Sequence, residues 1–232
     1  AGRRRYKAAF QVLAGFAVAT PPEAAWPMLD QACYALVVLL WGLKRQPIAM
    51  CVLLCFVGLL RIGEALSLTW ADLLMPDEHH SGAFVVIMLR NPKRAAINAH
   101  KVFLTNPLVI SLLVAYKAAF HTFSQDRCFK FSYNTFARHY QRALQGLGLD
   151  IRHYKSHSLR RGGATALALA GWPLARICEA GRWESEKSAK LYVMRGEVLL
   201  IRARAGLSAE QWRRLECLAR LLPALSFKLS DD

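Results

Sequence analysis

Two dense apolar runs near the start of the chain place the strongest limit on its fold. Residues 32–41 and 48–60 are almost entirely apolar, and Lys44, Arg45 and Pro47 separate them. Each run is too short for the ~20 residues that cross a bilayer. A helix that is apolar on every side is typical of a protein interior. We therefore predict two buried helices over 28–43 and 47–60, which form the first half of the core.

The rest of the chain is mostly helical in pattern, with one short β-rich stretch. A third short helix is expected over 63–70, followed by strands in GAFVVIML and HKVFLT that flank the basic connector RNPKRAAINA. Gly, Pro and capping signals then predict helices over 106–122, 133–146, 158–171, 173–180, 186–194 and 208–222. The expected fold class is mainly α with a small antiparallel β-sheet (α+β). The apolar spacing in the last helix predicts that it packs on its own domain.

The charge balance indicates a polyanionic partner. Lys and Arg number 31 against 16 Asp and Glu, which gives a formal net charge of +15. Nucleic acid is the first hypothesis, and an anionic membrane surface is the rival. We see neither a secretory signal nor a stop-transfer segment, so we expect an intracellular protein that acts at DNA, in the nucleus or the cytoplasm according to its source.

Neither the cysteines nor the paired histidines indicate a metal or cofactor. The six cysteines include no CxxC pair and are expected to be reduced and buried. His79 and His80 stand beside two acidic residues in a turn, where adjacent side chains rarely converge, so we expect an exposed loop. Residues 1–27, a basic start followed by TPPEAAWP, are interpreted as a linker or the remnant of a core-binding domain, and 28–232 as the principal domain.

Two arginines and a histidine have spacings that suit anion binding. His157 and Arg160 lie three residues apart at a predicted helix start, so both can face one anion near the helix N-terminus. Arg61 follows an apolar helix, where an arginine needs a partner to offset its desolvation. Glu64, three residues on, can orient it.

A phosphodiester is the anion that best suits these groups. Its pentacoordinate transition state gains negative charge on the nonbridging oxygens, which two guanidinium groups and a ring N–H can stabilise. Trp183 and Tyr192 lie nine residues apart, far enough to sit on successive elements. The indole N–H can then join the phosphate site, and the phenol can act as nucleophile.

These pieces resemble, in their order, the catalytic domain of the tyrosine recombinases, the phage-integrase-like family. The segment Gly58-Leu59-Leu60-Arg61-Ile62-Gly63-Glu64 is similar to the family's first arginine motif. The segment HSLR, which begins at His157, is similar to the family's H-x-x-R motif. HSLRRGGAT, then GRW and a tyrosine, is most similar to the transposon-encoded DIRS-type and Crypton-type recombinases.

The resemblance implies a DNA recombinase or integrase that cuts and rejoins strands through a 3′-phosphotyrosyl intermediate on Tyr192. By the same resemblance, Lys93 in the strand connector is the general acid, although Lys101 stands near a strand start as an alternative. Arg61, His157, Arg160 and Trp183 would bind the phosphate, with Glu64 behind them. Candidate contacts to the DNA backbone are Arg94, Arg161 and Arg182.

The chain departs from the usual family pattern at two positions. Trp183 stands where many members have a second histidine, and Arg182 where a glycine usually precedes it. The implied partner is double-stranded DNA, bound by a homotetramer, without a small-molecule cofactor or a membrane. The resemblance also suggests that the last helix docks on a neighbouring protomer. Alternatives are a type IB topoisomerase, a non-catalytic DNA-binding relic of a mobile element, and a membrane-surface protein.

Overall fold

The core of the protein is built on two buried helices in its first third. The structure is a computed structural model that describes residues 25–76, 84–90, 101–186, 189, 193, 203–204 and 206–225. Helices α2 (Asp30–Gly42) and α3 (Gln46–Val57) are buried along most of their length. Pro47 stands in the first turn of α3, where its missing N–H costs nothing. Both helices occur where the apolar runs predict them.

A small sheet follows the first helices, as the sequence predicts. After α4 (Ile62–Ser67) and the short 3₁₀ helix η1 (Trp70–Asp72), strands β1 (Leu73–Leu74), β2 (Val85–Met88) and β3 (Lys101–Leu104) pair antiparallel in that order. Leu73, Ile87 and Val102 stand side by side in the register and are buried. The sequence suggests only a weak β-leaning run before residue 77, and it does not give the bounds of β1, because two residues are too few to show alternation.

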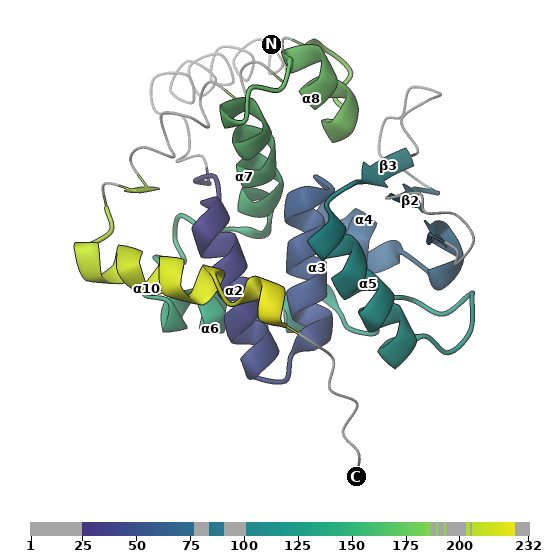
Figure 1. The fold of residues 1–232 in the computed structure, drawn as a ribbon, viewed down its shortest axis with the longest axis horizontal. Helices are drawn as coiled ribbons and strands as arrows, with labels where there is room; N and C mark the ends of the chain where they lie inside the picture. The colour runs from purple at the N-terminus through teal and green to yellow at the C-terminus, as the bar shows by residue number, and fades with distance from the viewer. Residues whose placement is uncertain are drawn as a thin grey trace, which may run out of the picture.

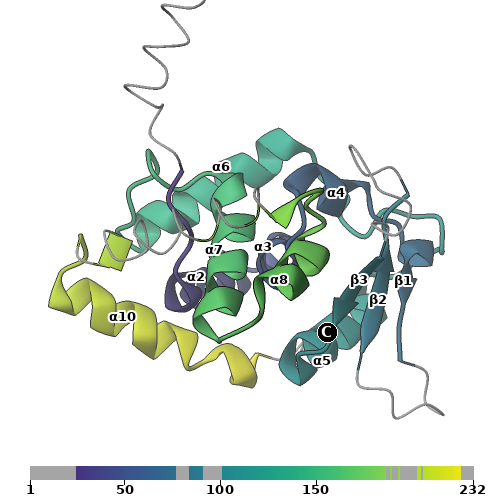
Figure 2. The same cartoon turned by 90° about the horizontal axis from the view of Figure 1, so that it is seen from above.

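Four helices complete the main body. They are α5 (Pro107–Phe120), α6 (Tyr133–Gly146), α7 (Ser156–Leu169) and α8 (Leu174–Gly181). Asn106 and Ser132 cap α5 and α6, each accepting a hydrogen bond from a backbone N–H in the first turn. The central helix, α3, contacts α2, α4, α5, α6 and α7 (Figures 1 and 2). The predicted fold class is confirmed.

The last described helix packs on the chain's own core. Helix α10 (Ala209–Ala219) crosses α2 on the side opposite α6 (Figure 2), and Leu215 is fully buried. The 3₁₀ helix η2 (Leu222–Ala224) continues this contact with α2. The structure thus shows the packing that the apolar spacing predicts. No helix in the described part of the chain is long and apolar enough to cross a membrane.

One sequence expectation needs correction, and three others fall largely or wholly outside the described residues. All six cysteines are free, but Cys217 is exposed on α10, so the prediction that all are buried is wrong there. Its position is on the solvent side of an amphipathic helix, which the spacing of the cysteines alone does not reveal. Of the predicted linker only 25–27 are described, and the predicted helix 186–194 and His79 and His80 lie largely or wholly outside the described residues.

Candidate active site

Arg61 and Glu64 form the outer part of a polar cluster at the end of α3. Arg61 is the N-cap of α4, and its backbone N–H donates to Glu64 Oε2 at 2.8 Å while its Nη1 donates to Glu64 Oε1 at 2.6 Å. The Arg61 side chain is 39% exposed and that of Glu64 only 8%. Glu64 therefore fixes Arg61 as the sequence suggests, with part of the guanidinium facing outward.

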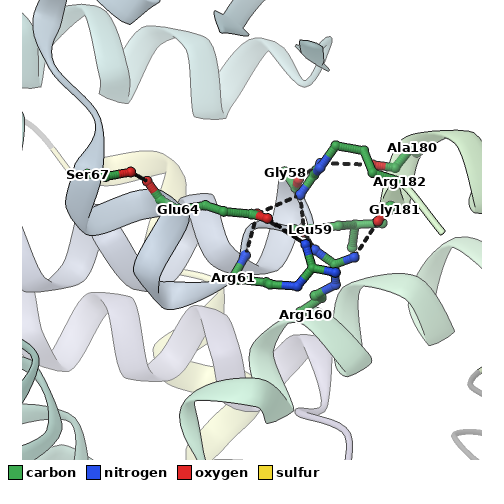
Figure 3. Close-up of polar contacts among 9 residues, drawn as sticks. All are labelled: Gly58, Leu59, Arg61, Glu64, Ser67, Arg160, Ala180, Gly181 and Arg182. Carbon is green, nitrogen blue, oxygen red and sulfur yellow. Dashed lines mark hydrogen bonds and ion pairs between the residues drawn. The ribbon is translucent and has the colours of Figure 1, made fainter. Parts of the chain in front are cut away.

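Arg160 comes to the same carboxylate from α7, but it is buried. Its Nη1 donates to the Leu59 carbonyl at 2.8 Å and lies 3.8 Å from Glu64 Oε2, and its Nη2 donates to the Gly181 carbonyl. Figure 3 shows this convergence. The side chain is 2% exposed. Arg160 thus joins the end of α3 to the end of α8.

Arg182 is the residue whose position differs most from the prediction. Instead of an exposed contact to DNA, its side chain is 3% exposed and its Nη2 donates to Glu64 Oε2 and to the Leu59 carbonyl, both at 2.9 Å. Its Nη1 donates to the carbonyls of Ala180 and Gly58. The physical reason is that the last turn of a helix leaves carbonyls without helical partners, and a buried guanidinium satisfies those at the end of α3.

Burial and charge act in opposite directions on Glu64. Burial alone would raise the pKa of this carboxyl, but the charge of Arg182 and the hydrogen bonds from Arg61 outweigh it, and the pKa is lowered. Glu64 is therefore ionised at neutral pH. Within the described cluster, one carboxylate faces three guanidinium groups, those of Arg61, Arg160 and Arg182.

His157 lies in the first turn of α7 at the exposed edge of the cluster. The atoms packed around its ring and the charges of Arg161, Arg160 and Arg61 lower its pKa to about 4. The imidazole is therefore neutral near pH 7, with one N–H donor and one acceptor nitrogen. The structure thus brings His157, Arg160 and Arg61 together, with Arg160 on the buried side.

Trp183 covers the buried side of the cluster. Its ring centroid lies 5.0 Å from Arg160 Cζ, and its backbone N–H donates to the Cys178 carbonyl. A Cβ on Gly181 would overlap the indole ring, so a larger residue at this position would displace Trp183. The structure places Trp183 as a platform for Arg160, a role that the sequence does not indicate.

Arg161 points toward the start of the described chain. Its Nη1 donates to the Ala25 carbonyl, and the side chain is partly buried. It was predicted as a contact to the DNA backbone, and this hydrogen bond instead holds the segment 25–29 against α7. Gly162 permits the approach, because a Cβ there would lie 2.8 Å from Met28 N.

Three predicted site residues lie outside the described residues, namely Lys93, Arg94 and Tyr192. Val193, next to Tyr192, is buried in a small cluster with Leu59, Ala164 and Ile177. Lys101, the alternative acid, is exposed at the start of β3. No group of three or more metal-ligating side chains occurs in the part of the chain that the structure describes.

Sequence reasoning missed the backbone part of the site. The Leu59 carbonyl accepts from both Arg160 and Arg182, and Leu59 itself has a left-handed backbone with φ 48°. A leucine gives no sequence signal for this conformation, which usually indicates glycine after a helix. Arg182, also left-handed at φ 55°, gave a weak signal by standing where a glycine is usual in the resembled family.

Comparison with known proteins gives one family and one fold. Residues 43–196, more than half of the chain, match the phage integrase family. No curated protein sequence matches the chain. Among solved structures, the crystal structure of XerA recombinase is similar, with a TM-score of 0.56 and 16% sequence identity over 86% of this chain. The chain spans 65% of the XerA chain, and at this identity the similarity concerns the fold.

Proposed function

The chain belongs to the phage integrase family, and from that premise we propose that it is a site-specific tyrosine recombinase that cleaves and rejoins double-stranded DNA. The family match over 43–196 includes every residue predicted to be catalytic. The proposed reaction joins a DNA 3′-phosphate to Tyr192 and later transfers it to a partner strand, so the bond energy is retained.

The observation that carries this proposal is the excess of positive charge at the end of α3. Three guanidinium groups face one carboxylate, and only Arg61 among them is substantially exposed. Preorganised donors of this kind stabilise the charge that develops on a phosphate during transesterification, and removing one commonly costs ~100-fold or more in rate. The exposure of Arg61 supports the proposal that it contacts the phosphate directly.

The proposed cleavage step assigns a task to Tyr192, Lys93 and His157. The Tyr192 phenol oxygen attacks phosphorus, the bond from phosphorus to the 5′-oxygen breaks, and Lys93 protonates that oxygen. His157, neutral near pH 7, can donate its N–H to a nonbridging oxygen or accept the phenolic proton. Val193 is buried in one cluster with Leu59, whose carbonyl accepts hydrogen bonds from Arg160 and Arg182. This proximity supports the proposal that the neighbouring residue, Tyr192, is the nucleophile.

Finer parts of the proposal concern the subset and the assembly. HSLRRGGAT, GRW and the following tyrosine support a transposon-encoded recombinase of the DIRS or Crypton type. We further propose a homotetramer on DNA, with residues 1–27 as the connection to an upstream DNA-binding domain. Mass measurement of the complex on a two-site DNA would test the stoichiometry, and a complex with one protomer per site pair would contradict it.

The test of the nucleophile uses nicked suicide duplexes that carry the element's own termini. The protein is expected to form a DNA adduct that survives denaturation, and Tyr192→Phe to form none, because it lacks the attacking oxygen. Tyr133→Phe, a change at an exposed tyrosine on α6, serves as the matched control. An equal adduct from Tyr192→Phe would remove Tyr192 from this role.

The test of the acid compares two leaving groups. Lys93→Ala is expected to slow cleavage of an ordinary 5′-oxygen substrate strongly, but a 5′-thio substrate little, because the thiolate leaves without protonation. Lys101→Ala, at the exposed start of β3, is the matched control. If Lys101→Ala gives the selective effect and Lys93→Ala does not, the acid is Lys101.

A further inference from the structure

We propose that Arg182 is a positioning residue that holds Glu64, and through it Arg61, in the geometry that receives the scissile phosphate. This inference rests on the proposed function. The Arg182 side chain is only 3% exposed, so it does not contact the DNA in the proposed reaction. It acts instead on Glu64 and Arg61.

The first argument comes from how the Glu64 carboxylate is shared. Oε1 accepts from Arg61 Nη1, whereas Oε2 accepts from the Arg61 backbone N–H and from Arg182 Nη2. Arg160 Nη1 lies 3.8 Å from the same Oε2. Without Arg182, Arg160 Nη1 would still lie within ion-pair distance of Oε2, and a rotation of the carboxylate toward it would weaken the hydrogen bond that Arg61 donates to Glu64.

The second argument comes from the turn that precedes Arg61. Arg182 donates to the carbonyls of Gly58 and Leu59, so it holds this turn as well as Glu64. Leu59 is left-handed there, a conformation that a leucine adopts only when the surroundings hold it. One guanidinium therefore fixes Arg61 through its backbone and through its ion-pair partner.

The third argument is the backbone of Arg182 itself. It caps α8 with φ 55° and ψ 45°, a region that glycine occupies without strain and arginine does not. A strained residue persists where its side chain makes interactions that compensate, and Arg182 donates to Glu64 on α4, to the carbonyls of Gly58 and Leu59 that follow α3, and to a carbonyl of its own turn. A glycine at position 182 would therefore remove the side chain and relieve the backbone strain in one substitution.

That property supplies the decisive variant. Arg182→Gly deletes the guanidinium while suiting the left-handed backbone, Arg182→Met deletes the charge with similar bulk, and Arg182→Lys keeps the charge. Arg214→Met, on the exposed face of α10, controls for the loss of one positive charge. Each is made in the full chain and assayed by single-turnover adduct formation on the suicide duplex, alongside DNA affinity.

The expected result separates rate from affinity. Arg182→Gly and Arg182→Met should lower stability, and in the protein that circular dichroism shows to be folded they should slow cleavage on the order of 100-fold through misplacement of Arg61, with DNA affinity retained. Because Arg182 is the main charge that lowers the pKa of Glu64, the acid limb of the pH–rate profile should move to higher pH in both variants. Arg182→Lys should restore the acid limb and part of the rate.

Two outcomes would overturn the inference. One is a wild-type rate and pH profile in Arg182→Gly; the other is a loss of DNA affinity at an unchanged cleavage rate, which would make Arg182 a DNA contact. If the wild-type protein forms no adduct, the proposed function fails instead. The pKa of Glu64, measured by carboxyl NMR, then still tests the inference, and an unchanged value in Arg182→Met would refute it.

Discussion

The substitution Gly163→Ala tests the close crossing of α3 and α7, on which the site is built. An ideal Cβ at Gly163 would overlap the Phe56 carbonyl oxygen, and it would lie 3.0 Å from the Phe56 carbonyl carbon and 2.7 Å from Leu59 Cδ2. Ordinary van der Waals contact begins at 3.4 Å. The first of these obstacles is backbone, so side-chain rotation cannot relieve it. The two helices would have to separate.

The magnitude follows from two opposing effects. Alanine favours a helix interior over glycine by up to ~1 kcal/mol. Overpacking of a well-packed core costs about 1–3 kcal/mol or more, and the rigid carbonyl places this site at the upper end of that range. The expected net loss of about 2 kcal/mol is a large part of a typical 5–15 kcal/mol unfolding free energy.

Urea unfolding followed by circular dichroism measures this loss. With a slope of about 2–3 kcal/mol per molar urea, the midpoint should fall by roughly 0.7–1 M. Gly42→Ala is the matched control, because a Cβ there meets nothing within 4 Å and the residue is also helical. It should leave the midpoint unchanged or raise it. Equal midpoints for the two variants would refute the close approach of α3 to α7.

Three further predictions concern charge. Glu64→Gln should destabilise the fold by about 3–5 kcal/mol in the same urea assay, because it leaves buried guanidinium groups without their carboxylate. Glu210→Gln, a change at an exposed carboxylate, is the control. A smaller loss for Glu64→Gln than for Glu210→Gln would contradict the ion pairs of Glu64. The pKa of His157 is lowered to about 4 in the folded protein, so as pH falls this imidazole binds a proton in the unfolded chain before it does so in the folded one. Stability should therefore decrease as pH falls from about 6.5 toward 4, and the unfolding free energy of His157→Asn should lose this pH dependence. With a net charge of +15, affinity for duplex DNA should fall steeply with salt for any sequence, and a flat response would argue against a basic binding face.

Much of the fold could be predicted because its signals are local. The apolar runs around Ala35 and Leu53 could only be buried helices, and Asn106 and Ser132 marked helix starts by their capping chemistry. The two longer strands show a β-branched apolar run in β2 and an alternation of exposed and buried residues in β3. The bounds of β1 could not be predicted, because its two residues are defined by a partner strand rather than by their own pattern.

The site was predictable in its residue types and less so in its geometry. Spacing indicated that Glu64 would orient Arg61, and that contact exists at 2.6 Å. The sequence offers Arg182 only as a candidate contact to the DNA backbone. Its burial depends on carbonyls more than 100 positions earlier in the chain, at Gly58 and Leu59, and no local pattern contains that information.

The arrangement at the end of α3 explains how so many positive charges can share one carboxylate. Burying guanidinium groups is costly unless oxygen acceptors replace water. Here the backbone supplies most of them, since Leu59 accepts from two arginines and Gly58, Ala180 and Gly181 accept from one each, although Arg182 Nε is buried without a hydrogen-bond partner. Carbonyl dipoles satisfy hydrogen bonds without cancelling net charge, so the described cluster stays positive. A site that satisfied its arginines with further carboxylates would repel a phosphate, whereas this one remains attractive to an anion at Arg61, where its charge reaches solvent.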